Sequence, residues 1–140
     1  MLLLIDEVEL NGSSHKVVKI RGRITRGLGE GAFYVAKYMD EFERALGFKP
    51  FQGTLNIELV EALEDMSRCS GVVVNPPTPE HAPVLAYRAF IGDGVDVFVV
   101  KPFKTKHDSK IIEIVSKHRL RDLLGLKDGD IVEVSIICND

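Results

Sequence analysis

The stretch Val18-Lys19-Ile20-Arg21-Gly22-Arg23-Ile24-Thr25 indicates the fold class of this chain. Apolar and small residues alternate with charged or polar ones, a period of two that is typical of a β-strand with one buried face. Further apolar runs, each bounded by turn residues, predict strands over residues 54–59, 71–74, 84–91, 95–100, 111–115 and 131–138.

Helical patterns are fewer. Apolar residues at helical spacing predict a helix over about residues 37–46, which Gly47 ends. A second short helix is predicted around Leu120, with Ser116 as its candidate cap. Residues 32–35 are predicted as a short strand.

The order of these elements predicts a mainly β fold with seven or eight short strands and one or two short helices. Strands and helices do not alternate as in βαβ units, so we predict a closed antiparallel barrel, which leaves no exposed strand edges. The helix at about 37–46 is expected on the outside of the barrel or over one mouth. Residues 1–140 are expected to form one domain, in which residues 1–15 add one extra strand packed on the barrel.

Composition limits the class of partner. A net charge of −3 provides no global positive field, which argues against a nucleic-acid partner. The apolar opening Met1–Ile5 is too short to span a membrane and lacks the features of a signal peptide. We therefore expect a cytoplasmic monomer without membrane contact. Cys69 and Cys138 form no CxxC pair and are predicted to be isolated small hydrophobic residues, not a disulfide, and no structural metal site is visible.

The first candidate for binding chemistry is Gly27-x-Gly29-x-Gly31. Closely spaced glycines let the backbone approach a ligand and can form an anion-binding nest. No Lys-Ser/Thr pair follows, so the segment is not a P-loop, and no immediate helix is predicted after it, as a Rossmann motif would require. A flexible hairpin turn is the more common structure for this spacing.

The second candidate is Gly53-Thr54-Leu55-Asn56. Thr54 and Asn56 stand two positions apart at a strand start, so their side chains point to the same side. A hydroxyl and an amide oxygen on one face suit Mg²⁺, which takes hard oxygen ligands. A polar strand end without a metal has the same pattern.

The third candidate is the basic loop and strand of residues 104–113, in which Glu113 stands between two isoleucines. Its carboxylate is either solvated or a buried ligand-binding group. The fourth is Lys117-His118-Arg119-Leu120-Arg121, whose four basic residues suit a polyphosphate or form a solvated helix face.

Taken in order, the motifs GLGEG, LGFKPFQGTLNIEL (46–59) and the stretch 104–130 closely resemble the archaeal CTP-dependent riboflavin kinases. The resemblance covers about residues 16–138 and leaves 1–15 as an N-terminal extension. It implies a closed six-stranded cradle-loop β-barrel. It also implies phosphorylation of riboflavin to FMN, with CTP as the phosphate donor, CDP as the second product and one Mg²⁺ ion.

The resemblance assigns roles to particular positions of this chain. It implies metal ligation by Thr54 and Asn56, and flavin contacts by Thr105 and Glu113. Glu113 is also the first candidate for a catalytic base, ahead of His107 and Asp108, with orientation of the ribityl chain as its alternative role. Nucleotide binding is implied for two segments: Leu28, Gly29, Glu30, Gly31, Ala32 and Phe33 in the first, and His118, Arg119, Leu120 and Arg121 in the second.

A non-catalytic barrel is the alternative, either a flavin- or nucleotide-sensing module or a DNA-binding regulator of the swapped-hairpin kind. The acidic balance of the chain argues against DNA binding. The joint presence of the glycine segment with Thr54 and Asn56 favours catalysis.

Overall fold

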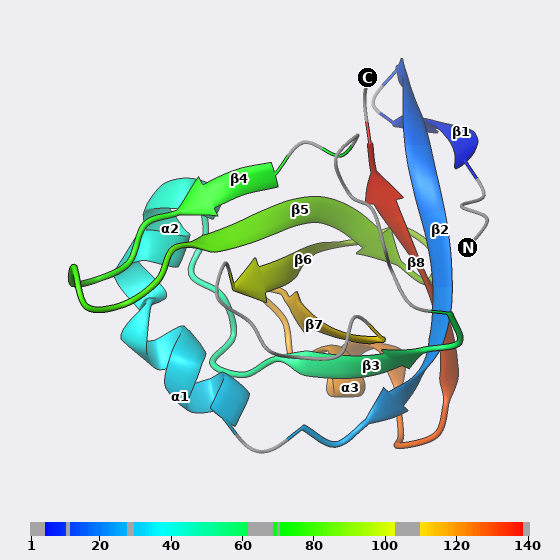
Figure 1. Ribbon diagram of the computed structural model, residues 1–140. Helices are drawn as coiled ribbons and strands as arrows, with labels where there is room; N and C mark the ends of the chain where they lie inside the picture. The colour runs from blue at the N-terminus through cyan, green and yellow to red at the C-terminus, as the bar shows by residue number, and fades with distance from the viewer. Residues whose placement is uncertain are drawn as a thin grey trace.

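A computed structural model of the chain describes residues 5–10, 12–27, 30–61, 69, 71–102 and 110–138 (Figure 1). Eight strands and three helices lie within the described residues, in the order β1 (Ile5–Leu10), β2 (Ser13–Thr25), α1 (Glu30–Lys37), α2 (Met39–Leu46), β3 (Leu55–Leu59), β4 (Gly71–Val74), β5 (Val84–Ile91), β6 (Val95–Pro102), β7 (Ile111–Val115), α3 (Leu120–Leu124) and β8 (Ile131–Ile137).

Six of the strands are hydrogen-bonded in a ring. Each pairs antiparallel with the next in the order β2, β3, β7, β6, β5 and β8, and β8 pairs again with β2. The remaining two strands extend this ring, β1 along β2 and β4 along β5. The described pairings are all antiparallel, so the prediction of a mainly β protein without parallel βαβ units is confirmed.

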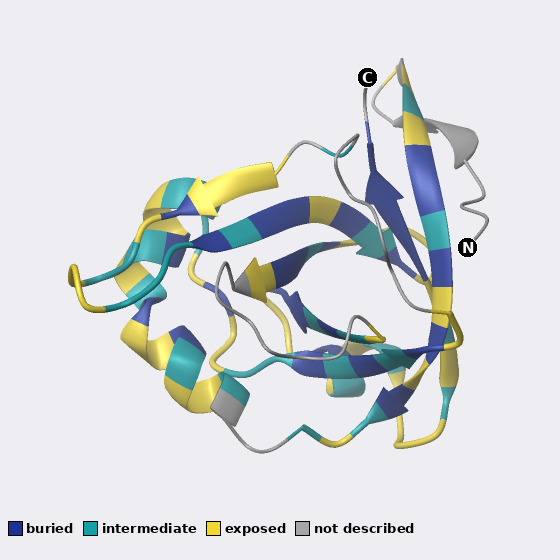
Figure 2. Cartoon of the chain, viewed as in Figure 1, coloured by how far each residue is buried: buried dark blue, intermediate teal, exposed yellow. Residues whose placement is uncertain are grey.

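The alternation that predicts β2 is borne out by its burial. Val18, Ile20 and Ile24 are buried, whereas Arg21 and Arg23 are exposed, which produces the alternating bands along β2 in Figure 2. Strand β3 repeats this pattern, with Leu55, Ile57 and Leu59 buried. These side chains belong to one apolar cluster that includes residues of all six strands of the ring. Polar side chains between them therefore face away from this core.

The glycine-rich segment leads into a helix, where a short strand was predicted. Residues 32–35 lie in α1, so the strand prediction is wrong. Val35, Tyr38 and Phe42 form one buried stripe across α1 and α2 and pack against residues of β4, β5, β6 and β7. Helical periodicity thus begins earlier than the apolar spacing indicates, and burial of this stripe stabilises both short helices. Helix α2 ends at Gly47 as expected, with a left-handed φ of 84°.

Two other predictions concern the N-terminal strand and the two cysteines. The expected extra strand near the N-terminus is β1. The prediction of two isolated cysteines is wrong, because Cys69 and Cys138 form a disulfide across 69 positions. Cys138 follows β8, and the fold brings it to Cys69 although nothing in the local sequence pairs them. None of the helices in the described residues is long and apolar enough to cross a membrane.

Candidate active site

A cavity of about 390 Å³ lies beside the strand ring, where the ends of β2 and β3 meet α1 and α3. Three of the predicted segments contribute to it: the glycine-rich segment, the start of β3 and the basic segment at α3. The cavity is lined by Thr25, Arg26, Gly27, Gly31, Ala32, Gly53, Thr54, Asn56, Arg119, Arg121 and Asp128.

Polar side chains from three strands meet on the outer face of the ring. Asn56 on β3 stands opposite Thr25 on β2 and opposite Glu113 on β7. The neighbours of Asn56 and Glu113 in their strands are buried in the core, so these two side chains point outward. The Thr54 hydroxyl donates a hydrogen bond to Glu113 Oε1 at 3.0 Å. This row places a hydroxyl, an amide and a carboxylate together.

The glycine-rich segment packs directly on this row. A Cβ atom at Gly27 would overlap the side-chain amide of Asn56, and one at Gly31 would overlap the Thr54 hydroxyl. Glycine at both positions therefore lets the backbone before α1 and in its first turn approach the polar ends of β3. This segment does open a helix, which corrects the expectation that none follows it directly.

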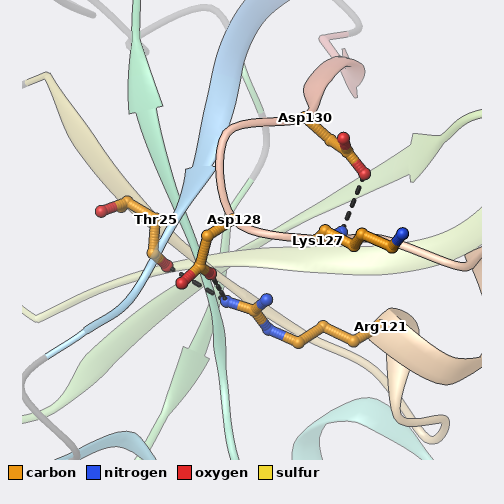
Figure 3. Close-up of polar contacts among 5 residues, drawn as sticks. All are labelled: Thr25, Arg121, Lys127, Asp128 and Asp130. Carbon is orange, nitrogen blue, oxygen red and sulfur yellow. Dashed lines mark hydrogen bonds and ion pairs between the residues drawn. The ribbon is translucent and has the colours of Figure 1, made fainter.

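The basic segment lies on another side of the cavity. Arg121 Nη2 donates to Asp128 Oδ1 at 2.6 Å and to the Thr25 carbonyl oxygen at 3.5 Å, which ties α3 to the end of β2 (Figure 3). Arg119, which directly precedes α3, pairs with Asp122 in the first turn of that helix. No described residue pairs with Arg26 in this way, so its guanidinium is available to an anion.

Tyr34 on α1 adds a buried hydroxyl close to this site. Its Oη is buried and has no hydrogen-bond partner among the described residues, and its ring lies 4.8 Å from that of Tyr38. Burial raises the pKa of Tyr34 well above its ordinary value, and the negative charges of Tyr38 and Glu113 raise it further. Tyr34 is therefore a neutral hydroxyl at physiological pH.

The sequence-predicted residues divide into three groups. Gly31, Ala32, Thr54, Asn56, Arg119 and Arg121 line the cavity, and Glu113 is bonded to Thr54. Phe33 is 74% exposed on α1 beside Ala32, His118 is exposed, and the Leu120 side chain is buried in the core, so only its backbone is available to a ligand. Leu28, Gly29 and Thr105 lie outside the described residues, as does the side chain of Glu30.

The donor set at the start of β3 fits a hard cation such as Mg²⁺. Because the Thr54 hydroxyl donates its proton to Glu113, its lone pairs remain available as a ligand. Asn56 supplies an amide oxygen beside it. The described residues contain no cluster of three or more His, Cys, Asp or Glu side chains suited to a metal, so an ion here would take several ligands from water or phosphate.

Three lining residues lie outside the candidate motifs of the sequence analysis: Thr25, Arg26 and Asp128. Thr25 and Arg26 directly precede Gly27, so extending the glycine motif by two residues finds them. Asp128 belongs to an Asp-Gly turn that the sequence marks only as a chain reversal. Its role at the cavity follows from the pairing of β8 with β2, which no local pattern reveals.

The fold and the cavity define an antiparallel β protein with a charged surface site at the edge of a six-stranded ring. A family model for CTP-dependent riboflavin kinases, described as a domain of unknown function (DUF120), matches residues 24–136. The chain therefore belongs to the CTP-dependent riboflavin kinase domain family.

Individual relatives agree with this family. The riboflavin kinase of Pyrobaculum arsenaticum is 41% identical over 129 residues, which cover 86% of this chain and 61% of the relative. That of Staphylothermus marinus is 39% identical over 120 residues, covering 85% of this chain and 92% of the relative. That of Sulfolobus acidocaldarius is 35% identical over 140 residues, covering 89% and 84%. The chain thus spans about three fifths of the Pyrobaculum relative and most of the other two.

Proposed function

We propose that the protein transfers the terminal phosphate of CTP to riboflavin and releases FMN and CDP. The observation that carries this proposal is the cavity itself, which joins the glycine-rich segment, Thr54 and Asn56, and the basic segment at α3. Phosphoryl transfer needs positioning and charge neutralisation more than covalent chemistry from the protein. Backbone N–H groups, two hard oxygen ligands and arginines are suited to that task.

The nucleotide phosphates would lie against the glycine-rich segment, residues 28–33. The close approach of Gly27 and Gly31 to Asn56 and Thr54 supports this placement, because it brings backbone amides beside the oxygen ligands. Arg26, which adjoins Gly27, would neutralise phosphate charge. The second nucleotide segment is His118 to Arg121, with Leu120 contributing through its backbone alone.

Thr54 and Asn56 would hold one Mg²⁺ ion. When bound, such an ion neutralises charge on the phosphate oxygens. Within the protein, Glu113 accepts a hydrogen bond from the Thr54 hydroxyl. The lone pairs of that hydroxyl oxygen would then face an incoming cation. The backbone of Gly31 lies close to the same hydroxyl.

Riboflavin would approach the outer face of β7 at Glu113. The other proposed flavin contact is Thr105, which lies outside the described residues. Glu113 is the proposed acceptor for the proton of the ribityl hydroxyl, since its carboxylate is half-buried and lies next to the proposed metal ligands. The ring of six strands is proposed to be the closed cradle-loop barrel of this family, with the cavity on its rim.

The direct test incubates the protein with riboflavin, CTP and Mg²⁺ and separates the products by chromatography. FMN and CDP in equal amounts are expected. If no nucleotide and no divalent metal yields FMN while riboflavin or CDP still binds, a flavin- or nucleotide-sensing module replaces the kinase. ATP in place of CTP should reduce kcat/KM by at least about tenfold.

A further inference from the structure

Asp128 is an acidic side chain in a cavity that otherwise gathers arginines. Its Oδ1 accepts a hydrogen bond from Arg121 Nη2, and its Oδ2 has no partner among the described residues (Figure 3). Arg121 donates to both Asp128 and Thr25 through Nη2. Its Nε and Nη1 have no partner among the described residues. The pair therefore presents an acceptor and donors side by side at the cavity.

The turn that carries Asp128 is held in place by backbone contacts. Gly129 N donates to the Ile24 carbonyl at 2.8 Å, and Ile24 N donates to the Asp130 carbonyl at 2.8 Å. Asp130 Oδ2 accepts from the backbone N of Lys127, so its carboxylate is turned away from Arg121 (Figure 3). Asp128 is thus fixed relative to β2, and a fixed polar group can discriminate between ligands.

Two groups of lining residues differ in charge. The region of Arg26, Gly27 and Asn56 combines glycine backbone with a cation that no described residue pairs with, and so suits phosphates. In the region of Arg121 and Asp128, the positive charge is already neutralised, and a further carboxylate oxygen would repel a phosphate. That region suits the neutral half of a nucleotide.

We propose that Asp128 and Arg121 together read the hydrogen-bonding edge of the donor's base, selecting a pyrimidine that carries an amino group. Cytosine offers its 4-amino group to the free oxygen of Asp128 and its ring acceptor to Arg121. Uracil reverses both groups, and so brings a carbonyl against a carboxylate and an N–H against a guanidinium. This inference rests on the proposed function, because it assumes that a nucleotide occupies the cavity.

The test measures binding of CDP and UDP by calorimetry to the wild type, Asp128→Asn and Asp130→Asn. The wild type should prefer CDP by at least about tenfold, because a mismatch leaves polar groups unpaired. Asp128→Asn should bring the two affinities within about threefold, since an amide can turn to offer either an acceptor or a donor. Asp130→Asn is the matched control in the same turn and should keep the wild-type preference.

A second measurement needs no variant and therefore covers the case in which Asp128→Asn fails to fold. A CDP analogue with hydrogen in place of the 4-amino group should bind the wild type at least about tenfold more weakly than CDP. Equal binding of the analogue and CDP would overturn the inference. An Asp128→Asn variant that keeps its preference for CDP over UDP would also overturn it. A variant that instead changes the preference between CDP and 2′-deoxy-CDP would overturn it too, because Asp128 would then contact the ribose. Those results leave the kinase intact, whereas a wild type that binds neither CDP nor UDP overturns the proposed function as well.

Discussion

The Thr54 hydroxyl and the Glu113 carboxylate are joined by a hydrogen bond of 3.0 Å across 59 positions of sequence. The bond connects the residue before β3 with the middle of β7, and Asn56 stands opposite Glu113 in the same sheet. One carboxylate thus lies between the proposed metal ligands and the proposed flavin face. Changes at Glu113 and at Asn56 should separate these two sides of the site.

Glu113→Gln should weaken riboflavin binding or turnover and leave the affinity for CDP nearly unchanged. The glutamine oxygen can still accept the hydrogen bond from the Thr54 hydroxyl, so the proposed metal ligands keep their geometry. The negative charge on the flavin side is lost. Riboflavin and CDP titrations by fluorescence and calorimetry measure the two effects. Glu58→Gln is a suitable control, because Glu58 faces outward on β3 in an exposed pair with Arg23. Equal losses of riboflavin and CDP binding in Glu113→Gln would indicate a structural role.

Asn56→Ala should lower turnover by about 10- to 1000-fold, since each tenfold step corresponds to about 1.4 kcal/mol of lost transition-state stabilisation. The residue lies on the outer face, so the apolar core and the unfolding midpoint should change little. Initial rates at several Mg²⁺ concentrations provide the measurement. A variant with wild-type rates at limiting Mg²⁺ would exclude Asn56 as a metal ligand.

Gly31→Ala tests the close approach of α1 to β3. Alanine in place of glycine in a helix ordinarily stabilises it by about 1 kcal/mol. Here the added Cβ would overlap the Thr54 hydroxyl, so either the helix or Thr54 must shift. We expect at least about a tenfold loss of kcat/KM, with thermal stability retained to within about 1 kcal/mol. Full activity would show that the start of α1 moves freely away from Thr54.

How much of this site follows from sequence differs between its parts. The strands of the ring are well predicted, because their alternating or apolar runs are local and their turns contain glycine or proline. Thr54 and Asn56 could be grouped correctly for the same reason, as two positions on one strand face. Their contacts with Gly31 and Glu113 join distant segments, and no local pattern reveals them.

The errors have the same physical origin. Residues 32–35 are short and apolar enough to suit a strand, but in α1 Ala32 and Phe33 are exposed while Val35 packs against residues of β4 to β7. Cys69 and Cys138 are 69 positions apart, and their pairing depends on where β8 ends relative to the segment after β3. From sequence, Asp128 is only a turn residue. Its place at the cavity depends on the backbone hydrogen bonds between that turn and Ile24. Tertiary contacts determine all three.

The disulfide should stabilise the fold substantially. Closing a loop of 69 residues restricts the unfolded chain and corresponds to about 4 kcal/mol by the chain-entropy relation. Urea unfolding of the oxidised protein, compared with the protein kept in a reductant, should show this loss. Cys138→Ser should be equally destabilised and insensitive to the reductant. A reductant effect of the same size in Cys138→Ser would rule out the bond as its cause.

Tyr34 and Tyr38 form a matched pair for the role of a buried hydroxyl. Tyr38 Oη donates to the Ala82 carbonyl at 2.7 Å, whereas no described residue is hydrogen-bonded to the buried Tyr34 Oη. Tyr38→Phe should therefore lower the free energy of unfolding by about 1 kcal/mol, because it leaves that carbonyl without its donor. Tyr34→Phe should leave the free energy of unfolding unchanged or raise it by up to about 1 kcal/mol, because the substitution removes an unpaired polar group from the interior. A loss in Tyr34→Phe as large as that in Tyr38→Phe would reveal a hydrogen bond to Tyr34 that the structure lacks.

The same two tyrosines predict the response of the fold to alkaline pH. Burial raises the pKa of both above the ordinary value of about 10 that an unfolded tyrosine has. The folded state then holds its phenolic protons when the unfolded state has released them. Stability from these groups is fully present below about pH 10 and is lost as pH rises through the folded pKa values, by up to about 1.4 kcal/mol per pH unit for each tyrosine. Urea unfolding between pH 8 and 11 should show this decline in the wild type and a shallower one in Tyr34→Phe. An equal slope in both proteins would mean that Tyr34 ionises alike in the folded and unfolded chains and is not shielded from solvent.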